Sequence, residues 1–304
     1  MLSAKPWKLE AVARLLLSVF ICIFAGSVLT SVLHYGSTGG KTGAKFFLLA
    51  AAVALAFLGA ALVLLGKEWR LERFMVRLLL LAICLYAGMF LGGWAQQIGG
   101  APAADNSVGR MIIATLSFQG AALGLTARFV RQHQVGWAEA FGFSDQWRHA
   151  LLLGLITASI FLPLGWVLQQ GSAQLMTHLS RFSIEPEEQQ AVQALRIAVR
   201  RVDRIALGSV TILLAPVAEE VLFRGILYPW IKQAGFPRLA LWTTSLAFAA
   251  MHLNLVIFLP LLVLALILTL LYEKTNNLLA PITAHALFNA MNFATLYLFD
   301  KQSG

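Results

Sequence analysis

The chain has 304 residues, of which 59% are hydrophobic and only 12% are charged. An ordinary soluble domain is about 45–50% apolar and about 25% charged. A surface with this few charged residues would not be well hydrated in water. The composition therefore excludes a soluble globular protein and indicates that lipid covers much of the chain. The net charge of +9 does not indicate nucleic acid, because no basic patch with interleaved aromatic residues is present. We expect it to lie in loops, where it sets orientation and meets anionic headgroups.

Nine apolar runs follow one another along the chain. A bilayer core about 30 Å thick needs about 20 such residues in a helix. The runs fall near residues 12–33, 44–65, 74–98, 108–128, 147–170, 206–230, 238–256, 257–273 and 278–299. The seventh and eighth have almost no polar residues between them, so the number of spans is eight or nine. The predicted fold is an all-α, multi-pass integral membrane protein.

The first run also predicts the side on which the N-terminus lies. It follows Lys5, Lys8 and Arg14, and no A-x-A cleavage site comes after it, which favours an uncleaved first span over a signal peptide. With the N-terminus inside, the short inner loops carry more Lys and Arg residues than the short outer loops. The sequence therefore predicts a cytoplasmic N-terminus.

The long polar connection 171–205 has apolar residues at three- and four-residue steps, namely Val192, Leu195, Val199 and Val202. Arginines occupy the other faces, so we predict an amphipathic helix at the membrane interface. A surface helix packed on loops and a lid over a site are the alternatives.

A loop rich in Trp and Phe divides the chain near residue 145. Residues 1–145 form an N-terminal transmembrane region, and residues 146–304 form a core with polar groups in its helices at about 206–299.

The run 206–230 carries three charges near its middle, Glu219, Glu220 and Arg224. Each costs at least about 2.5–3.5 kcal/mol at that depth. Glu220 and Arg224 are four residues apart on one helical face and can neutralise each other as a structural ion pair. Glu219 is left without a partner on the helix, and such a carboxylate suits a general base. Pro216, one turn earlier, predicts a kink in the helix.

Two later runs supply matching polar groups. Phe248 and His252 stand four residues apart in the run 238–256, and His285 and Asn289 stand four apart in the run 278–299. Singly, each polar residue is explained by interhelical hydrogen bonding. Together with the glutamates, they favour a catalytic cluster.

The order EExxxR, FxxxH and HxxxN, each in an apolar run, resembles the CPBP family of intramembrane proteases. This family comprises type II CAAX prenyl endopeptidases and bacteriocin-processing or abortive-infection relatives. The resemblance covers roughly residues 147–299. It implies an endopeptidase in which Glu219 and His252 activate water while His285 and Asn289 stabilise the oxyanion.

The resemblance gives the other motif residues supporting roles. Glu220 and Arg224 would hold the site or engage the end of the substrate, and Phe248 would shape the pocket or pack in the core. Glu219, His252 and His285 also make a Glu/His/His set that can hold zinc with an open fourth position. The chain lacks the HExxH pattern, and we expect a metal-free glutamate mechanism, with a divalent metal such as zinc as the alternative cofactor.

The expected partners are a peptide or membrane-protein substrate and the lipid bilayer. A transporter is the first alternative, because polar groups at the middle of broken helices also bind transported solutes. The absence of a matching polar set in residues 1–145 counts against it. The second alternative is a non-proteolytic immunity or scaffold protein that uses the same cluster for binding.

Overall fold

The structure is a computed structural model and describes residues 5–36, 57, 59, 61, 115–143, 146–179, 201–252 and 254–300. Every regular element in these ranges is helical, which confirms the predicted all-α class. The chain divides into two compact units, one formed by Trp7–Phe129 and the other by Met1–Pro6 together with Val130–Gly304. The predicted division into residues 1–145 and 146–304 stays a prediction.

The unit Trp7–Phe129 is built around α1 (Leu9–Gly36), the π-helical segment η1 (Leu116–Gly120) and most of α5 (Ala121–Gln132). Trp7 and Phe129 contact edge to face, with ring centroids 5.5 Å apart. The Ser18 hydroxyl donates to the Ala61 carbonyl at 3.0 Å, which satisfies a polar group inside an apolar helix pair. The predicted runs 44–65 and 74–98 fall almost entirely outside the described residues.

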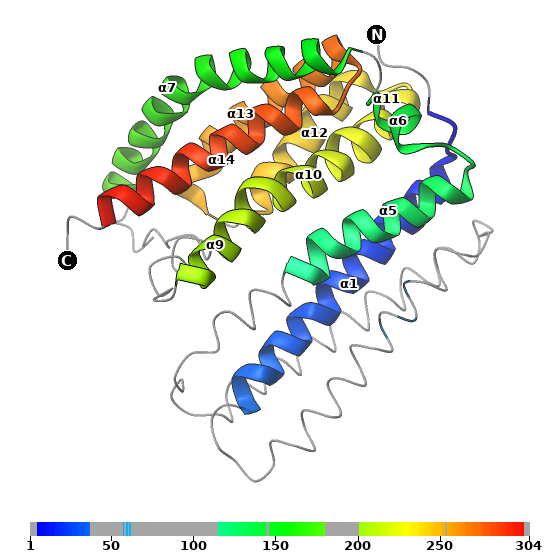
Figure 1. The fold of residues 1–304 in the computed structure, drawn as a ribbon, viewed down its shortest axis with the longest axis horizontal. Coiled ribbons are helices and arrows are strands. Elements are labelled where there is room, and N and C mark those ends of the chain that lie inside the picture. The colour runs from blue at the N-terminus through cyan, green and yellow to red at the C-terminus, as the bar shows by residue number, and fades with distance from the viewer. Residues whose placement is uncertain are drawn as a thin grey trace. The chain divides into compact units, whose positions relative to one another are not determined.

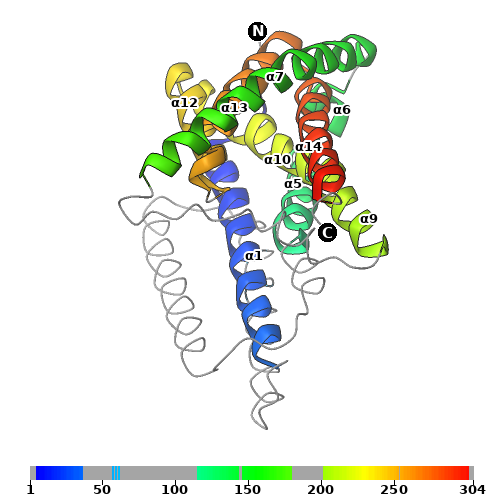
Figure 2. The same cartoon turned by 90° about the vertical axis from the view of Figure 1, so that its left-hand side faces the viewer.

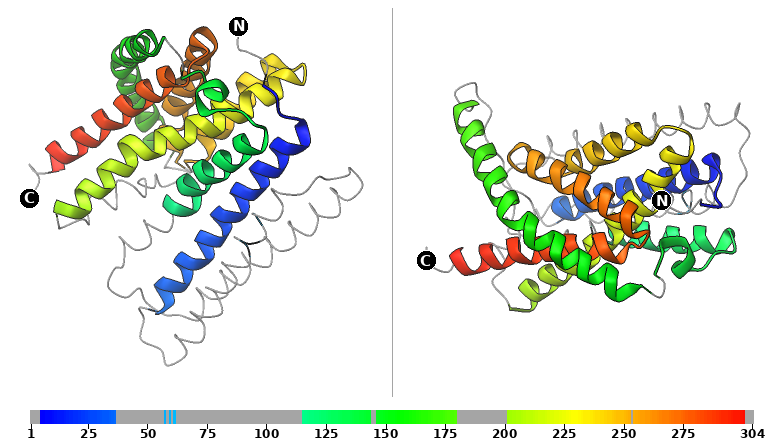
Figure 3. Two further views of the ribbon diagram at one scale, coloured as in Figure 1. Left: turned by 45° about the vertical axis from the view of Figure 1, so that its right-hand side comes forward. Right: turned by 90° about the horizontal axis from the view of Figure 1, so that it is seen from above.

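The unit Val130–Gly304 carries all the motifs. Its elements are α6 (Trp137–Phe141), α7 (Trp147–Leu179), α9 (Arg201–Ser209), η3 (Val210–Leu214), α10 (Ala215–Glu220), η4 (Val221–Leu227), α11 (Tyr228–Gln233), α12 (Pro237–Ala250), α13 (Leu255–Thr275) and α14 (Leu279–Asp300). Helix α7 packs along both α13 and α14, and α12 packs against α13 (Figure 1). Helix α14 lies beside the α9–α10 stretch and runs in the opposite chain direction (Figure 3, left).

Four helical stretches among the described residues are long and apolar enough to cross a membrane. They are Glu10–Thr30, Trp147–Met176, Val202–Gln233 and Leu255–Thr275. The chain is therefore of the membrane-helix class that the composition predicts, and the total of eight or nine spans stays a prediction. The predicted interfacial helix lies largely in residues 180–200, outside the described part. Residues 171–179 differ from the prediction, because they continue α7 instead of opening a loop.

Helix α7 shows how this unit meets lipid. Large apolar side chains are exposed along it at Leu152, Ile156, Ile160 and Trp166, with Ile160 at 68% exposure. Exposing such a row of apolar side chains to water is unfavourable in free energy, whereas exposing it to lipid acyl chains is favourable. The opposite face is buried at Phe161, whose ring packs against Phe288 of α14 at 5.6 Å.

Residues 201–233 form one continuous helical stretch with two π-helical segments, and a proline follows each of them. Ala215 donates its N–H to Val210, five residues earlier, and Pro216 comes next. Tyr228 donates to Phe223 in the same way, and Pro229 comes next. A proline has no N–H and its ring presses on the carbonyl four residues earlier. We attribute both wider turns to this clash, so the predicted disturbance at Pro216 takes the form of η3.

Helix α12 is only 14 residues long and ends at Ala250, before the predicted span does. Asn254 then caps α13, accepting hydrogen bonds from the backbone N–H groups of Val256 and Ile257 at 3.0 and 3.2 Å. His252 therefore lies in the turn between the two helices. With about 1.5 Å per residue, α12 covers about 21 Å, which is less than a bilayer core.

The contact between α7 and α14 depends on Gly154. A Cβ atom at this position would lie 2.5 Å from the Ala280 carbonyl oxygen and 2.8 Å from the Thr283 Cβ. Backbone atoms cannot move away as a flexible side chain can. Gly154 therefore fixes how closely α14, which carries two of the motif residues, approaches α7.

We predict that Gly154→Ala lowers stability by about 1–3 kcal/mol, because it overpacks a close helix contact. Gly171→Ala is the matched control, since it lies on the same helix with nothing within 4 Å of the new Cβ. Thermal unfolding of both variants in detergent measures the difference. Equal unfolding midpoints for the two variants would contradict the packing described above.

Candidate functional site

The buried ion pair between Glu220 and Arg224 forms the centre of the site. Arg224 Nη1 donates to Glu220 Oε1 at 2.7 Å, and Arg224 and Glu220 are 1% and 0% exposed. The ion pair expected from their four-residue spacing therefore forms, and it lies fully inside the unit. A buried pair of this kind is tolerated only when its remaining donors also find acceptors.

Helix α13 supplies those acceptors. Arg224 Nη2 donates to the Ala265 carbonyl at 3.0 Å, and Nε lies 3.4 Å from the Thr269 hydroxyl oxygen. The guanidinium carbon lies 4.6 Å from the centre of the Phe248 ring, a cation–π distance. Thr269 was not among the residues predicted from the sequence. A signal for it was present, because Thr269 is the one polar residue between Ile257 and Leu271 of the sequence.

His285 of α14 contacts both glutamates. Its Nδ1 lies 3.0 Å from Glu220 Oε1, the same oxygen that accepts from Arg224. Its Nε2 lies 3.9 Å from Glu219 Oε2. The first distance is that of a hydrogen bond, and the second is too long for one but suits a bridging water. His285 is 2% exposed, so neither contact competes freely with solvent.

Glu219 is more open than its neighbour. Its side chain is 12% exposed, against 0% for Glu220. Glu219 Oε2 is buried and has no hydrogen-bond partner among the described residues. An ionised carboxylate oxygen in this state is costly unless a ligand, water or proton completes it. Glu220 Oε2 is likewise buried without a hydrogen-bond partner among these residues, but Glu220 Oε1 is held by Arg224 and His285. The greater exposure of Glu219 therefore makes it the glutamate more open to water or a substrate.

The Phe248 ring connects the two histidines. Its centre lies 5.1 Å from the His252 ring and 5.5 Å from the His285 ring. Phe223 packs edge to face on the same ring at 5.4 Å. The two histidines come from different helical segments and meet at the ring of Phe248, near the end of the short helix α12.

His252 and Asn289 are held by backbone carbonyls. His252 Nδ1 lies 2.8 Å from the Phe248 carbonyl oxygen. Asn289 Nδ2 donates to the Thr211 carbonyl of η3 at 2.9 Å. The structure thus brings Glu219, Glu220 and His285 within 4 Å of one another. His252 reaches this group through the Phe248 ring, and Asn289 lies one helical turn beyond His285 and binds η3.

The predicted metal alternative needs Glu219, His252 and His285 around one point. Within the described part of the chain, no three His, Cys, Asp or Glu side chains are grouped closely enough to hold a metal ion. His285 Nδ1 faces Glu220, and the Nδ1 atom of His252 faces a carbonyl. Such contacts at Nδ1 leave both Nε2 atoms available to a metal. Glu219, His252 and His285 do not surround one point, however, so this arrangement does not support metalloendopeptidase chemistry.

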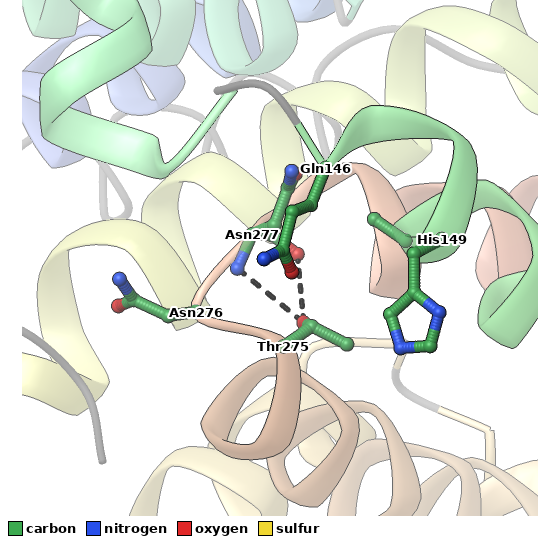
Figure 4. Close-up of a pocket in the computed structure, with 6 residues that line it drawn as sticks. Gln146, His149, Thr275, Asn276 and Asn277 are labelled. Carbon is green, nitrogen blue, oxygen red and sulfur yellow. Dashed lines mark hydrogen bonds between the residues drawn. The ribbon is translucent and has the colours of Figure 1, made fainter.

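A polar cavity of about 260 Å³ lies at the junction of α7 with the turn between α13 and α14. Its lining residues are Gln146, His149, Ala150, Thr275, Asn276 and Asn277 (Figure 4). Inside it, the Thr275 hydroxyl donates to the Asn277 carbonyl and accepts from the Asn277 N–H. No motif residue lines this cavity. Its hydrogen bonds close the turn that starts α14 and so help to place His285.

Comparison with known proteins adds to this geometry. Residues 201–291 match the family model of the type II CAAX prenyl endopeptidases, Rce1-like. This segment is Rce1-like. The resemblance predicted from the three motifs is thereby confirmed, since Glu219, Glu220, Arg224, Phe248, His252, His285 and Asn289 all lie within the matched residues.

A curated bacterial protein is also similar to part of this chain. The uncharacterized protein YpbD of Bacillus subtilis (strain 168) is 40% identical over 92 residues, which cover 29% of this chain. The chain spans only 44% of the length of that relative. No solved structure shows a significant match. The Rce1-like segment thus lies in a chain with several helices long and apolar enough to cross a membrane.

We predict that Phe248→Leu lowers stability by about 1–3 kcal/mol, because it removes one cation–π contact and three ring contacts from the Rce1-like segment. Phe236→Leu is the control, since Phe236 precedes the same helix and is 57% exposed. We expect a change within about 0.5 kcal/mol for the control. Thermal unfolding in detergent compares the two, and equal losses would show that the ring contacts contribute nothing.

Proposed function

We propose that the protein is an intramembrane endopeptidase of the CPBP or CAAX type that cleaves peptide bonds at or within the bilayer by a glutamate mechanism. The observation that carries this proposal is the pair of glutamates facing His285. Glu220 is fully buried and neutralised by Arg224, whereas Glu219 is 12% exposed and its Oε2 lies 3.9 Å from a histidine nitrogen. Two adjacent carboxylates thus have separate environments and can have separate roles.

Glu219 is the general base in this proposal. A water between Glu219 Oε2 and His285 Nε2 would lie within hydrogen-bond reach of both. Glu219 takes a proton from this water, and the oxygen attacks the carbonyl carbon of the substrate. His252 assists: the Phe248 carbonyl can only accept, so the ring proton of His252 lies on Nδ1 and its Nε2 carries a lone pair.

His285 and Asn289 are the oxyanion donors. Asn289 uses one amide hydrogen on the Thr211 carbonyl and retains a second. Donors held by fixed carbonyls and carboxylates need little reorganisation when charge develops, and this is the main advantage of such a site. The substrate is a peptide or a segment of a membrane protein. The basic residues of the short inner loops support an N-terminus in the cytoplasm.

We predict that Glu219→Gln lowers the cleavage rate at least about 100-fold, because the amide cannot accept the proton of water. The variant should unfold at the wild-type temperature within error. Glu139→Gln, at an exposed position of α6, is the matched control and should cleave normally. Normal processing of a reporter substrate by Glu219→Gln would remove the catalytic assignment.

We also predict that prolonged dialysis against EDTA leaves cleavage unchanged, because Glu219, His252 and His285 do not surround one point. Elemental analysis of the purified protein should find far less than one zinc per chain. If EDTA abolished cleavage and the addition of zinc restored it, the glutamate mechanism would be contradicted and the metal mechanism favoured.

A further inference from the structure

We propose that Glu220 is a positioning residue that keeps the proton of His285 on Nδ1, and that Arg224 serves to hold Glu220 and not to bind the substrate's terminal carboxylate. This inference rests on the proposed function of the same site. It assigns to the second glutamate and the arginine a role that the three motifs alone leave open.

The first step concerns the proton between Glu220 and His285. Arg224 Nη1 donates to Glu220 Oε1 at 2.7 Å, a distance typical of a charge-assisted hydrogen bond to an ionised carboxylate. An ionised carboxylate has no hydrogen to give. The 3.0 Å contact from the same oxygen to His285 Nδ1 must therefore be donated by the histidine.

The second step follows from the ring. When a neutral imidazole carries its hydrogen on Nδ1, its Nε2 presents a lone pair. His285 Nε2 points into the space shared with Glu219 Oε2, 3.9 Å away. In the neutral form His285 can accept a hydrogen there, and in the cation it donates from Nε2 while Glu220 balances the charge. The donor that an oxyanion needs is thus the cation, which forms when the proton that Glu219 takes from the attacking water passes to His285 Nε2. Glu220 then lies behind the cation as its counter-charge.

The third step concerns Arg224. Its guanidinium is 1% exposed and donates to Glu220, to the Ala265 carbonyl and to Thr269, while one face lies over Phe248. Three of its five N–H donors thus have acceptors inside the protein, one on each nitrogen. A substrate carboxylate would have to enter this closed space to reach the remaining two. The arrangement instead forms a chain of contacts from α13 through Arg224 and Glu220 to His285.

The groups that face His285 are few. Glu219 and Glu220 approach it from α10, Arg224 reaches it only through Glu220, and the Phe248 ring covers one side. His252 lies beyond that ring. In the described part of the chain, Glu220 accepts the hydrogen bond from His285 Nδ1. Removing Glu220 should therefore abolish the preference of His285 for the Nδ1–H tautomer.

The test uses the full chain with ¹⁵N-labelled histidine, in detergent or bilayers. The ring nitrogen shifts report which nitrogen carries hydrogen, and the spectrum of His285→Gln assigns the signal among the six histidines. We expect the Nδ1–H form for His285 in the wild type. An Nε2–H form in the wild type would overturn the proposal directly.

The decisive variant replaces both members of the ion pair, Glu220→Met with Arg224→Met. Replacing a buried pair by apolar side chains of similar length is often neutral for stability, whereas removing one partner leaves a buried charge. Lys232→Met with Glu273→Met is the control, because it removes a different, partly exposed ion pair, one that joins the same long helical stretch to α13. We expect the first variant to lose the Nδ1–H preference and about 10–100-fold in kcat with little change in KM. The control should retain both, and equal behaviour of the two variants would refute the positioning role.

Glu220→Gln provides a second measurement if the double variant does not fold. The glutamine keeps an acceptor oxygen at this position but loses the negative charge. We therefore expect His285 to keep its hydrogen on Nδ1 and kcat to fall. A changed KM with an unchanged kcat would contradict the positioning role.

The arginine is tested with peptides that differ only at the C-terminus. If Arg224 bound a substrate carboxylate, Arg224→Lys would reduce the advantage of a free carboxylate over a carboxamide. We expect the ratio of the two kcat/KM values to be the same in this variant and the wild type. A fall in that ratio would refute this part of the proposal.

The outcome for this proposal is separable from that for the protease itself. Normal cleavage by Glu219→Gln would remove the proposed function and leave the tautomer result standing. An inactive Glu219→Gln together with an Nε2–H form of His285 would remove only the positioning role of Glu220.

Discussion

The structure of the motif-bearing unit depends on one buried charge. The guanidinium of Arg224 lies inside an apolar helix bundle, where an unpaired ion is not tolerated. Its donors fix the neighbouring elements: Glu220 one turn back, and Ala265 and Thr269 across the interface on α13. Phe248 of α12 covers its face. The contacts of Arg224 therefore join three helices. Its partner Glu220 contacts a fourth helix, α14, through His285. Figure 2 shows these elements grouped within the unit.

The same constraint explains why two adjacent glutamates are not equivalent. Neighbouring residues on a helix point about 100° apart. Glu220 faces Arg224, and its Oε1 is bound by Arg224 and His285, whereas Glu219 is the more exposed of the two. The Oε2 atom of each glutamate has no hydrogen-bond partner among the described side chains. Of the three buried ionisable groups, Glu220 and Arg224 therefore stabilise each other, and Glu219 remains available for a reaction.

Much of this could be read from the sequence. The apolar runs predict membrane helices, and the four-residue spacings place Glu220 with Arg224, Phe248 with His252, and His285 with Asn289. What the spacing could not give is contact between helices. That His285 faces both glutamates, that Thr269 and Ala265 complete the arginine, and that Thr211 holds Asn289 depend on helix tilt and packing, which a period of 3.6 residues does not encode. The length of α12 was also misjudged, because the apolar residues continue past Ala250 while the helix ends there.

The two π-helical segments have a consequence for how this chain can vary. Each contains one residue more than an α-helix would use to cover the same rise. Deleting a residue from η3, Val210–Leu214, would therefore give a regular helix with Glu219 and Glu220 facing nearly as they do now relative to α9. Deleting a residue from a regular α-helical turn instead rotates everything beyond it by about 100°. Around this site, therefore, the wide turn is the place where the chain can change in length while the carboxylates keep their neighbours.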